Sequence, residues 1–325
     1  MSTQLNMLPQ TDGNSDGSAA ITTPQDVSPR TNNVPNITVH SISSSAMLVE
    51  FGVSQWMGRK KDKKASAEVT ADNNAETGVA SVNKKLFGNC AELNAVHKFT
   101  GNMRNTHYGM TMPWSDTGLR LLPTAQYFKY HNLMTAGEAE YWKLVAAFVA
   151  VYEWLKSQAQ AKLGDLYNPA EYPATVAELE RRFAFRVSYV PLPDAGDFRI
   201  DIANDTLTQV KTDYEEYYSR QLTGAMNNVW ARLHTALTRM SERLSYKSDG
   251  KKEVFRDSLV SNVIDMVELL DVCNVTGDSQ MAALKAKLSD AMYGVTADVL
   301  REDTFTRDDT KRTVDQIIAS LPSLE

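Results

Sequence analysis

The order of apolar and polar positions divides the chain into a polar beginning and a mainly helical remainder. Residues 1–44 are rich in Ser, Thr, Asn, Gln, Pro and Gly and contain only isolated apolar positions. Such a stretch buries too little surface to offset the entropy lost on ordering, so we expect a disordered tail. The patterns that follow predict an α+β core with a long helix over 45–247 and a C-terminal helical bundle segment over 252–325.

Three short segments have the alternation that is typical of β-strands. Met47–Ser54 alternates loosely and is rich in β-branched and aromatic residues. Phe185–Val190 and Phe198–Ile202 also alternate, and a rigid loop over 191–197 connects them. We therefore expect these last two segments to be strands of one small antiparallel sheet.

Apolar positions at helical spacing cover most of the remaining chain. They predict helices at Asn83–Arg104, Pro123–Met134, Ala136–Leu163, Asp205–Ser245, Val254–Val272, Ser279–Val299 and Arg307–Ala319. Gly164 is expected to end the third of these, and Thr175 and Glu178 form the capping box of a further short helix. The longest helix, whose apolar positions slip by one residue near Gly224, would span roughly 60 Å. The predicted fold is mainly α (α+β): a helical bundle with one long helix and a small antiparallel sheet.

Composition and charge narrow the class of protein. Hydrophobic residues at 42% are enough for a core, and the net charge of -6 argues against a protein that coats DNA. The two cysteines lie far apart in sequence, which fits a reducing compartment. No secretory signal is visible, and the most apolar stretch, Tyr141–Leu155, is too short for a membrane span and is interrupted by Lys143 and Glu153. We expect a cytoplasmic protein without a membrane span.

The segment Thr106–Pro123 holds the densest group of residues that restrict backbone geometry. It combines two aromatic residues, two prolines and two glycines with a histidine, an aspartate and an arginine, so it predicts a structured loop or hairpin. Ser115, Asp116 and Gly118 are typical of a turn in which the aspartate binds backbone amides and the glycine takes a positive φ. We expect the histidine and the arginine to be the most accessible polar groups of a structural or docking element. The candidate binding residues are His107, Trp114, Asp116 and Arg120.

Motifs for catalysis or cofactor binding are weak. His97, His107 and Asp116 are near one another in sequence, but the two histidines are not four residues apart, the spacing that puts two metal ligands on one helical face. Ser115 lacks the glycines of a nucleophile elbow, and the Gly250–Lys252 segment lacks the preceding glycine of a phosphate-binding loop. We therefore assign no catalytic, cofactor or metal residues. A hydrolase or metal enzyme centred on His107 and Asp116 stays open as a third hypothesis.

A run of basic residues follows the first predicted strand. Its side chains could contact phosphates or an acidic protein, with the indole of an upstream tryptophan available for stacking. A run of this size is also typical of a solvated surface, which is the interpretation that the acidic net charge favours. The candidate residues are Trp56, Arg59, Lys60, Lys61, Lys63 and Lys64.

Several segments are distinctive in combination. They are Val53–Trp56 with the basic run Gly58–Lys64, Thr111–Pro123, Leu163–Asn168 with Tyr172-Pro173, and Pro191–Arg199. Together they resemble a family of uncharacterised proteins, a domain of unknown function encoded by tailed bacteriophages and large conjugative plasmids, over residues 45–250. The resemblance implies a partner role, because genes of this family accompany a MoxR-type AAA ATPase and a von Willebrand A-domain protein related to cobalt-chelatase subunits. It implies no catalytic residues.

The extended amphipathic helices and the weak catalytic motifs predict a non-enzymatic phage or plasmid protein. We expect it to act through protein–protein interaction in the cytoplasm of a bacterial host, as a partner or adaptor of the ATPase that the resemblance implies. The coiled-coil-like seam of Ser279–Val299 and the long helix are compatible with a homodimer. The alternative is a nucleic-acid-binding protein that uses the basic run at 59–64.

Overall fold

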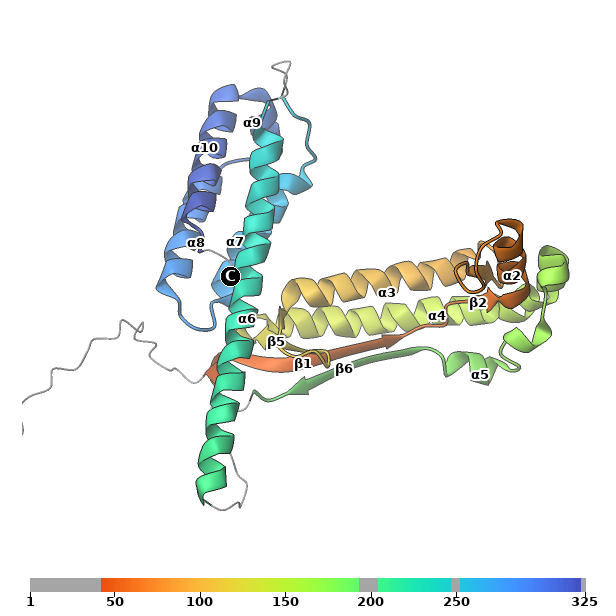
Figure 1. Cartoon of the computed structure of the whole chain (residues 1–325). Helices are drawn as coiled ribbons and strands as arrows, with labels where there is room; N and C mark the ends of the chain where they lie inside the picture. Colours follow the sequence, from red (N-terminus) through yellow and green to blue (C-terminus); the bar gives the residue numbers. More distant parts are fainter. Residues whose placement is uncertain (1–41, 193–203, 247–251, 323–325) are drawn as a thin grey trace, which may run out of the picture. The chain divides into compact units, whose positions relative to one another are not determined.

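The computed structural model describes residues 42–192, 204–246 and 252–322. These residues are mainly helical with a small antiparallel sheet, which confirms the predicted fold class (Figure 1). The elements are α1 (Ile42–Ser45), β1 (Ala46–Ser54), β2 (Arg59–Asp62), α2 (Lys63–Asp72), β3 (Val82–Lys85), α3 (Ala91–Met110), β4 (Met112–Pro113), β5 (Leu119–Pro123), η1 (Thr124–Gln126), α4 (Tyr127–Leu163), η2 (Gly164–Leu166), η3 (Pro169–Glu171), α5 (Val176–Glu180), β6 (Ala184–Val190), α6 (Asn204–Leu244), α7 (Ser258–Cys273), α8 (Ser279–Met292), α9 (Ala297–Glu302) and α10 (Thr304–Ser320). None of the described helices has both the length and the apolar composition of a membrane span.

The main sheet contains four described strands in the order β4-β5-β1-β6. β1 pairs antiparallel with both β5 and β6, so the predicted strands Met47–Ser54 and Phe185–Val190 are confirmed. The third predicted strand, Phe198–Ile202, lies outside the described residues, as does the predicted tail up to residue 41. Residues 42–44, assigned to that tail, belong to the helix α1.

Alternate residues of the sheet enter two hydrophobic cores, because successive side chains of a strand point to opposite faces. Val49 and Leu122 join a core with the aromatic side chains of α4. Leu48 and Leu121 join a second core, which contains the buried residues of α6, α7, α8 and α10. The β1–β5 ladder therefore contributes to both cores.

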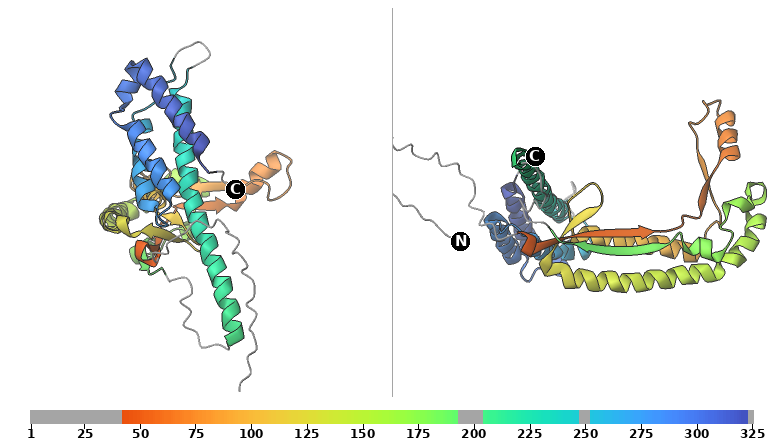
Figure 2. Two further views of the ribbon diagram at one scale, coloured as in Figure 1. Left: turned by 90° about the vertical axis from the view of Figure 1, so that its left-hand side faces the viewer. Right: turned by 90° about the horizontal axis from the view of Figure 1, so that it is seen from below.

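The segment before α3 differs from the predicted helix Asn83–Arg104. Its first residues form β3, which pairs antiparallel with β2, and α3 begins only at Ala91 and continues to Met110. Gly88 has a φ of 61°, a left-handed conformation that separates strand from helix. The prediction was wrong here because pairing with a strand distant in sequence outweighed the local helical spacing. Figure 2 (right) shows β2, α2 and β3 together in orange.

The predicted helices Pro123–Met134 and Ala136–Leu163 merge into one continuous helix, α4, which begins only at Tyr127, because Pro123 ends β5 and Thr124–Gln126 form η1. It packs closely against α3 at Gly137, where an added Cβ would lie within 2.4 Å of Cε of Met103. The predicted end of the helix is confirmed, because Gly164 takes a φ of 51° directly after it.

Thr175 begins α5 as predicted. Its hydroxyl accepts a hydrogen bond from the backbone N–H of Glu178 at 3.1 Å, and the Glu178 carboxylate accepts one from Ala174 N at 2.9 Å. Thr175→Ala is therefore expected to lower the free energy of unfolding by about 1 kcal/mol, measured by urea denaturation. Thr135→Ala, the same change at an exposed position inside α4, is the control and should cause no loss. Equal effects of the two changes would contradict the capping role.

The C-terminal helices are more divided than the sequence predicts. α6 is one helix that runs through Gly224, as predicted for Asp205–Ser245. The predicted helix Ser279–Val299 is wrong, because α8 ends at Met292 and Gly294 then takes a φ of 69°. The hydroxyl of Thr296 caps the separate helix α9. A positive φ is incompatible with a continuing helix, and the seam residues alone do not reveal the break.

Arg307 of α10 forms hydrogen bonds with the backbone at the ends of several elements. Its side chain is 1% exposed and lies 5.4 Å from the ring centre of Phe255. The guanidinium donates hydrogen bonds of 2.8–3.4 Å to five backbone carbonyl oxygens, those of Arg243, Leu244, Ser245, Glu253 and Leu300. Carbonyl groups at the ends of helices carry partial negative charge and have no partner within the helix, so one buried cation satisfies the ends of α6 and α9 together.

Candidate functional site: the basic face of β2 and β3

The basic run forms most of β2 and the beginning of α2. β2 pairs with β3 so that Arg59 lies opposite Lys85, and Lys61 lies opposite Asn83. Because side chains alternate along a strand, Arg59, Lys61 and Lys85 share one side of this two-stranded sheet. All three are exposed. We call these three residues the basic face.

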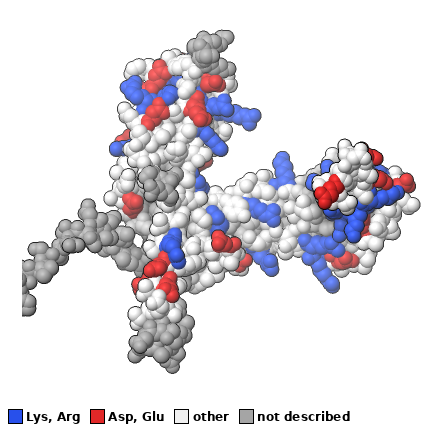
Figure 3. Space-filling view, in the orientation of Figure 1, with Lys and Arg blue, Asp and Glu red and all other residues white. Residues whose placement is uncertain are grey.

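Like charges are concentrated on the basic face. Among the ion pairs between described residues, none involves Arg59, Lys61 or Lys85. Like charges directly opposite each other on neighbouring strands destabilise a sheet. Figure 3 shows Lys and Arg side chains over the region of β2 and α2, with acidic side chains beside them, so the positive charge is local.

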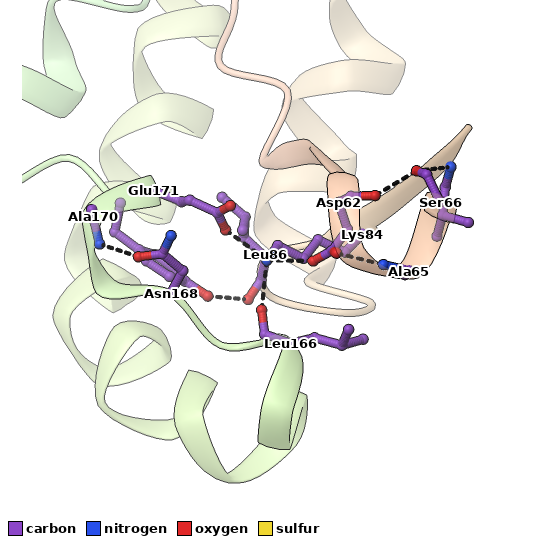
Figure 4. Close-up of polar contacts among 11 residues, drawn as sticks. Asp62, Ala65, Ser66, Lys84, Leu86, Leu166, Asn168, Ala170 and Glu171 are labelled. Carbon is purple, nitrogen blue, oxygen red and sulfur yellow. Dashed lines mark hydrogen bonds and ion pairs between the residues drawn. The ribbon is translucent and has the colours of Figure 1, made fainter. Parts of the chain in front are cut away.

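On the opposite side of the same sheet Lys84 is buried and its charge is balanced, while its neighbour Lys60 is exposed. Lys84 forms ion pairs of 2.9 Å with Asp62 and 3.0 Å with Glu171, and it donates a 2.6 Å hydrogen bond to the carbonyl of Leu166 (Figure 4). Burial alone would lower the pKa of Lys84, but the two carboxylates outweigh burial and raise it. The lysine therefore fastens β3 to the segment that follows α4.

Asp62, the last residue of β2, also begins α2. Its carboxylate accepts a hydrogen bond from Ala65 N at 3.0 Å, and its backbone carbonyl accepts one from the hydroxyl of Ser66. The hydrogen bond from Lys84 is the main cause that lowers the pKa of Asp62. Ser66 in turn accepts a 3.0 Å hydrogen bond from Val82 N, so α2 is joined to the start of β3. These contacts hold together β2, α2 and the start of β3, and so fix the backbone that carries the basic face.

Trp56 does not belong to the basic face, which corrects the prediction that its indole is available for stacking. Its side chain is only 6% exposed and packs against Phe87, Phe148 and Tyr152 at centroid distances of 5.6–6.1 Å. The backbone carbonyl of Trp56 lies 2.9 Å from Nε2 of His97. An aromatic residue beside a basic run looks the same in sequence whether it enters the core or stays on the surface.

The other basic candidates lie around this face without joining it. Lys60 is exposed and lies opposite the buried Lys84. Lys63 and Lys64 form the first turn of α2 and are exposed, and Lys64 is 4.0 Å from Glu68. Lys85 was not among the predicted residues, because its place beside Arg59 follows from the pairing of β3 with β2.

The Thr106–Pro123 segment is a helix end followed by a hairpin, so the prediction of a structured element is confirmed. β4 and β5 pair across a turn in which Gly118 takes a φ of 102° and donates to Ser115 O. The predicted bonds of Asp116 to backbone amides are wrong: Ser115 and Thr117 hydroxyls bond each other at 2.8 Å, and Asp116 is exposed. Trp114 is buried and packs on Tyr218 of α6.

Arginines from two elements bind the end of α3. Arg120 of β5 donates to the hydroxyl of Thr111 at 2.7 Å and to its carbonyl at 3.0 Å. Arg232 of α6 donates to the carbonyl of Gly109. These are the carbonyls that a helix leaves without partners, so the segment is a junction between α3, the sheet and α6. Arg120 is half-buried, and two of its nitrogens, Nε and Nη2, donate to Thr111.

His107 is the least accessible of the predicted polar groups, which corrects the expectation that it is among the most accessible. It is 3% exposed, and its Nδ1 lies 2.8 Å from the hydroxyl of Tyr130. Burial, together with the nearby charge of Arg120, lowers the pKa of His107 to about 4. Its ring lies 5.4 Å from that of the partly buried Phe51 of β1 and 5.9 Å from that of the buried Tyr130 of α4, so it points toward the sheet and α4. The sequence places a histidine in this segment but does not show which way it points.

The remaining candidates for chemistry are not brought together. His97 and His107 lie on the same helix but have different partners. His97 contacts the carbonyl of Trp56, and His107 contacts the hydroxyl of Tyr130. The described residues contain no group of three or more His, Cys, Asp or Glu side chains placed to hold a metal ion. Cys90 and Cys273 are free and buried.

Comparisons of the chain with protein-family models, with curated proteins and with solved structures find no match. The resemblance to the phage and plasmid family therefore stays a prediction from its sequence segments.

Proposed function

We propose that the protein is a non-enzymatic binding protein and that its basic face docks an acidic protein partner. The observation that carries the proposal is the cross-strand pair of like charges, in which Arg59 lies opposite Lys85 with Lys61 next along the same side. An isolated sheet is destabilised by this arrangement. Carboxylates from a partner would relieve the repulsion between these cations. The placement of the charges therefore favours the binding of an acidic partner.

The contrast with Lys84 supports the same proposal. That lysine belongs to the same two strands but is held by two carboxylates and a carbonyl. For Lys84 the chain supplies two counter-charges. For Arg59, Lys61 and Lys85, which face outward, it supplies none among the described ion pairs.

The sequence resemblance names the first partners to test, a MoxR-type AAA ATPase and a von Willebrand A-domain protein. A role as a phage or plasmid adaptor in the bacterial host cytoplasm is part of this proposal. It is supported by the same segments, one of which, Gly58–Lys64, contains two residues of the basic face.

The basic face can be tested by triple substitution. Arg59→Ala, Lys61→Ala and Lys85→Ala together are expected to weaken binding to an acidic partner about 10- to 100-fold, since each exposed ionic contact contributes up to about 1 kcal/mol. Biolayer interferometry with the purified ATPase and A-domain protein measures the change. Binding by the unchanged protein should also weaken as salt rises.

The matched control removes three exposed cations from other parts of the chain: Lys129, Lys287 and Arg312, each changed to Ala. It carries the same net charge as the triple variant and should bind as the unchanged protein does. Equal weakening in both variants would show a general charge effect and contradict a specific docking face.

The same face supports a second candidate function, binding of nucleic acid phosphates. Arg59, Lys61 and Lys85 could contact a phosphate backbone, but the burial of Trp56 removes the stacking residue that single strands would use. Labelled duplex and single-stranded DNA at low salt test this candidate by gel shift. A salt-dependent shift that the triple variant loses would favour it over an acidic protein, and no shift would remove it.

A further inference from the structure

The middle of α4 is apolar on all sides. From Leu144 to Tyr152 it contains only aliphatic and aromatic residues. A helix that is apolar all round is normally buried all round. Here one side is buried, with Val145, Phe148 and Tyr152 in the core, while the other side remains exposed.

The exposed side consists of small residues flanked by two tryptophans. Ala146, Ala147 and Ala150 are exposed, and Trp142 and Trp154 are 40% and 61% exposed. α5 borders this side, where Ala177 lines a shallow hollow together with Trp142 and Ala146. Small side chains allow a second helix to approach closely, and exposed tryptophans are the residues that contribute most at interfaces.

The charges at the ends of this segment indicate what covers it. Lys143 directly precedes the apolar stretch, and Glu153 directly follows it, so both are equally distant from the central Phe148. Trp142 and Trp154 are related in the same way. In a reversed copy of the segment aligned at Phe148, Trp142 is level with Trp154 and Lys143 is level with Glu153.

We propose that the exposed side of α4 is the interface of a two-fold dimer, in which the same helix of a second copy packs antiparallel. In a two-fold interface one surface meets itself, so residue i contacts residue j and residue j contacts residue i. Antiparallel packing about Phe148 places Lys143 of each copy beside Glu153 of the other and Ala146 beside Ala150. Parallel packing would instead place Lys143 beside Lys143. This surface is separate from the basic face, so the inference does not depend on the proposed function.

Charge reversal tests the pairing in sedimentation equilibrium over a range of concentrations. Lys143→Glu places two glutamates together at each end and is expected to weaken dimerisation at least about tenfold. Adding Glu153→Lys restores opposite charges and should return the dissociation constant to within about threefold of the unchanged protein. Lys129→Glu, the same change at an exposed position on the same helix, is the control. A monomer at all concentrations, a dimer indifferent to Lys143→Glu, or no rescue by the double change would each overturn the proposal.

Cross-linking tests the orientation independently. Ala146→Cys and Ala150→Cys are made as separate proteins, and each exposed thiol is oxidised alone and in an equal mixture, while the native cysteines are buried. The mixture should form disulfide dimers at least about tenfold faster than either protein alone, because the antiparallel arrangement brings the two different positions together. Faster linking of either single variant would overturn the antiparallel arrangement.

Discussion

Arg307→Met is expected to lower the free energy of unfolding by about 3–5 kcal/mol, the range for removing one partner from a buried charged network. The guanidinium donates to five backbone carbonyls: three at the end of α6, one in the last turn of α9 and one in the segment before α7. Methionine fills similar space but donates nothing, so each of these carbonyls loses the hydrogen bond from the guanidinium. Urea denaturation followed by circular dichroism measures the loss.

Arg312→Met provides the control on the same helix. Arg312 is exposed, and among the described residues its ion pair is with Asp309 across one helical turn at 3.3 Å, so its loss should change stability by no more than about 0.5 kcal/mol. Arg307→Lys should recover little, since one ammonium group cannot reach carbonyls on several elements. A loss below about 1 kcal/mol for Arg307→Met would contradict the role assigned to this residue.

His107 alone is expected to make the folded chain about 3 kcal/mol less stable at pH 4 than at pH 7. Its pKa is about 4 in the folded chain, lowered by burial and by Arg120 from the ordinary value of 6.5. Above pH 6.5 neither state binds a proton at this position. As the pH falls below 6.5 the unfolded chain binds one first, so stability is lost progressively down to about pH 4. The difference between the two pKa values sets the size of the loss.

His107→Gln should remove this part of the pH dependence, measured as the free energy of unfolding at pH 7, 6, 5 and 4.5. The variant is expected to be less stable at pH 7, because it disturbs the contact with Tyr130, but to have a flatter profile. His234→Gln, a change at an exposed histidine of α6, should leave the profile in place. A profile as steep in His107→Gln as in the unchanged protein would contradict the burial of a neutral histidine.

Local signals in the sequence predicted much of the fold. β1 and β6 follow from alternation over more than half a dozen residues, and α6 follows from helical spacing sustained along its length. The end of α4 at Gly164 and the start of α5 at Thr175 depend on single residues with strong conformational preferences. Each of these features is decided by neighbours in sequence.

Features decided by distant residues were not predictable in the same way. The pairing of β2 with β3 created the basic face, and it also turned part of a predicted helix into a strand. Trp56, His107 and Arg307 are polar or aromatic residues whose burial depends on partners 23 to 92 residues away. Their types indicate importance, but only the packed structure shows that Trp56 and His107 serve the core while Lys85 joins the candidate site.

Docking of an acidic protein on the basic face can be measured by comparative affinity capture from nuclease-treated lysates of phage-infected or plasmid-bearing bacteria, with quantitative mass spectrometry. The baits are the unchanged protein, the variant with Ala at Arg59, Lys61 and Lys85, and the control with Ala at Lys129, Lys287 and Arg312. We expect an acidic protein to be recovered with the unchanged bait and the control and to be depleted at least about tenfold with the basic-face variant. Recovery of the same proteins in the same amounts with all three baits would contradict it.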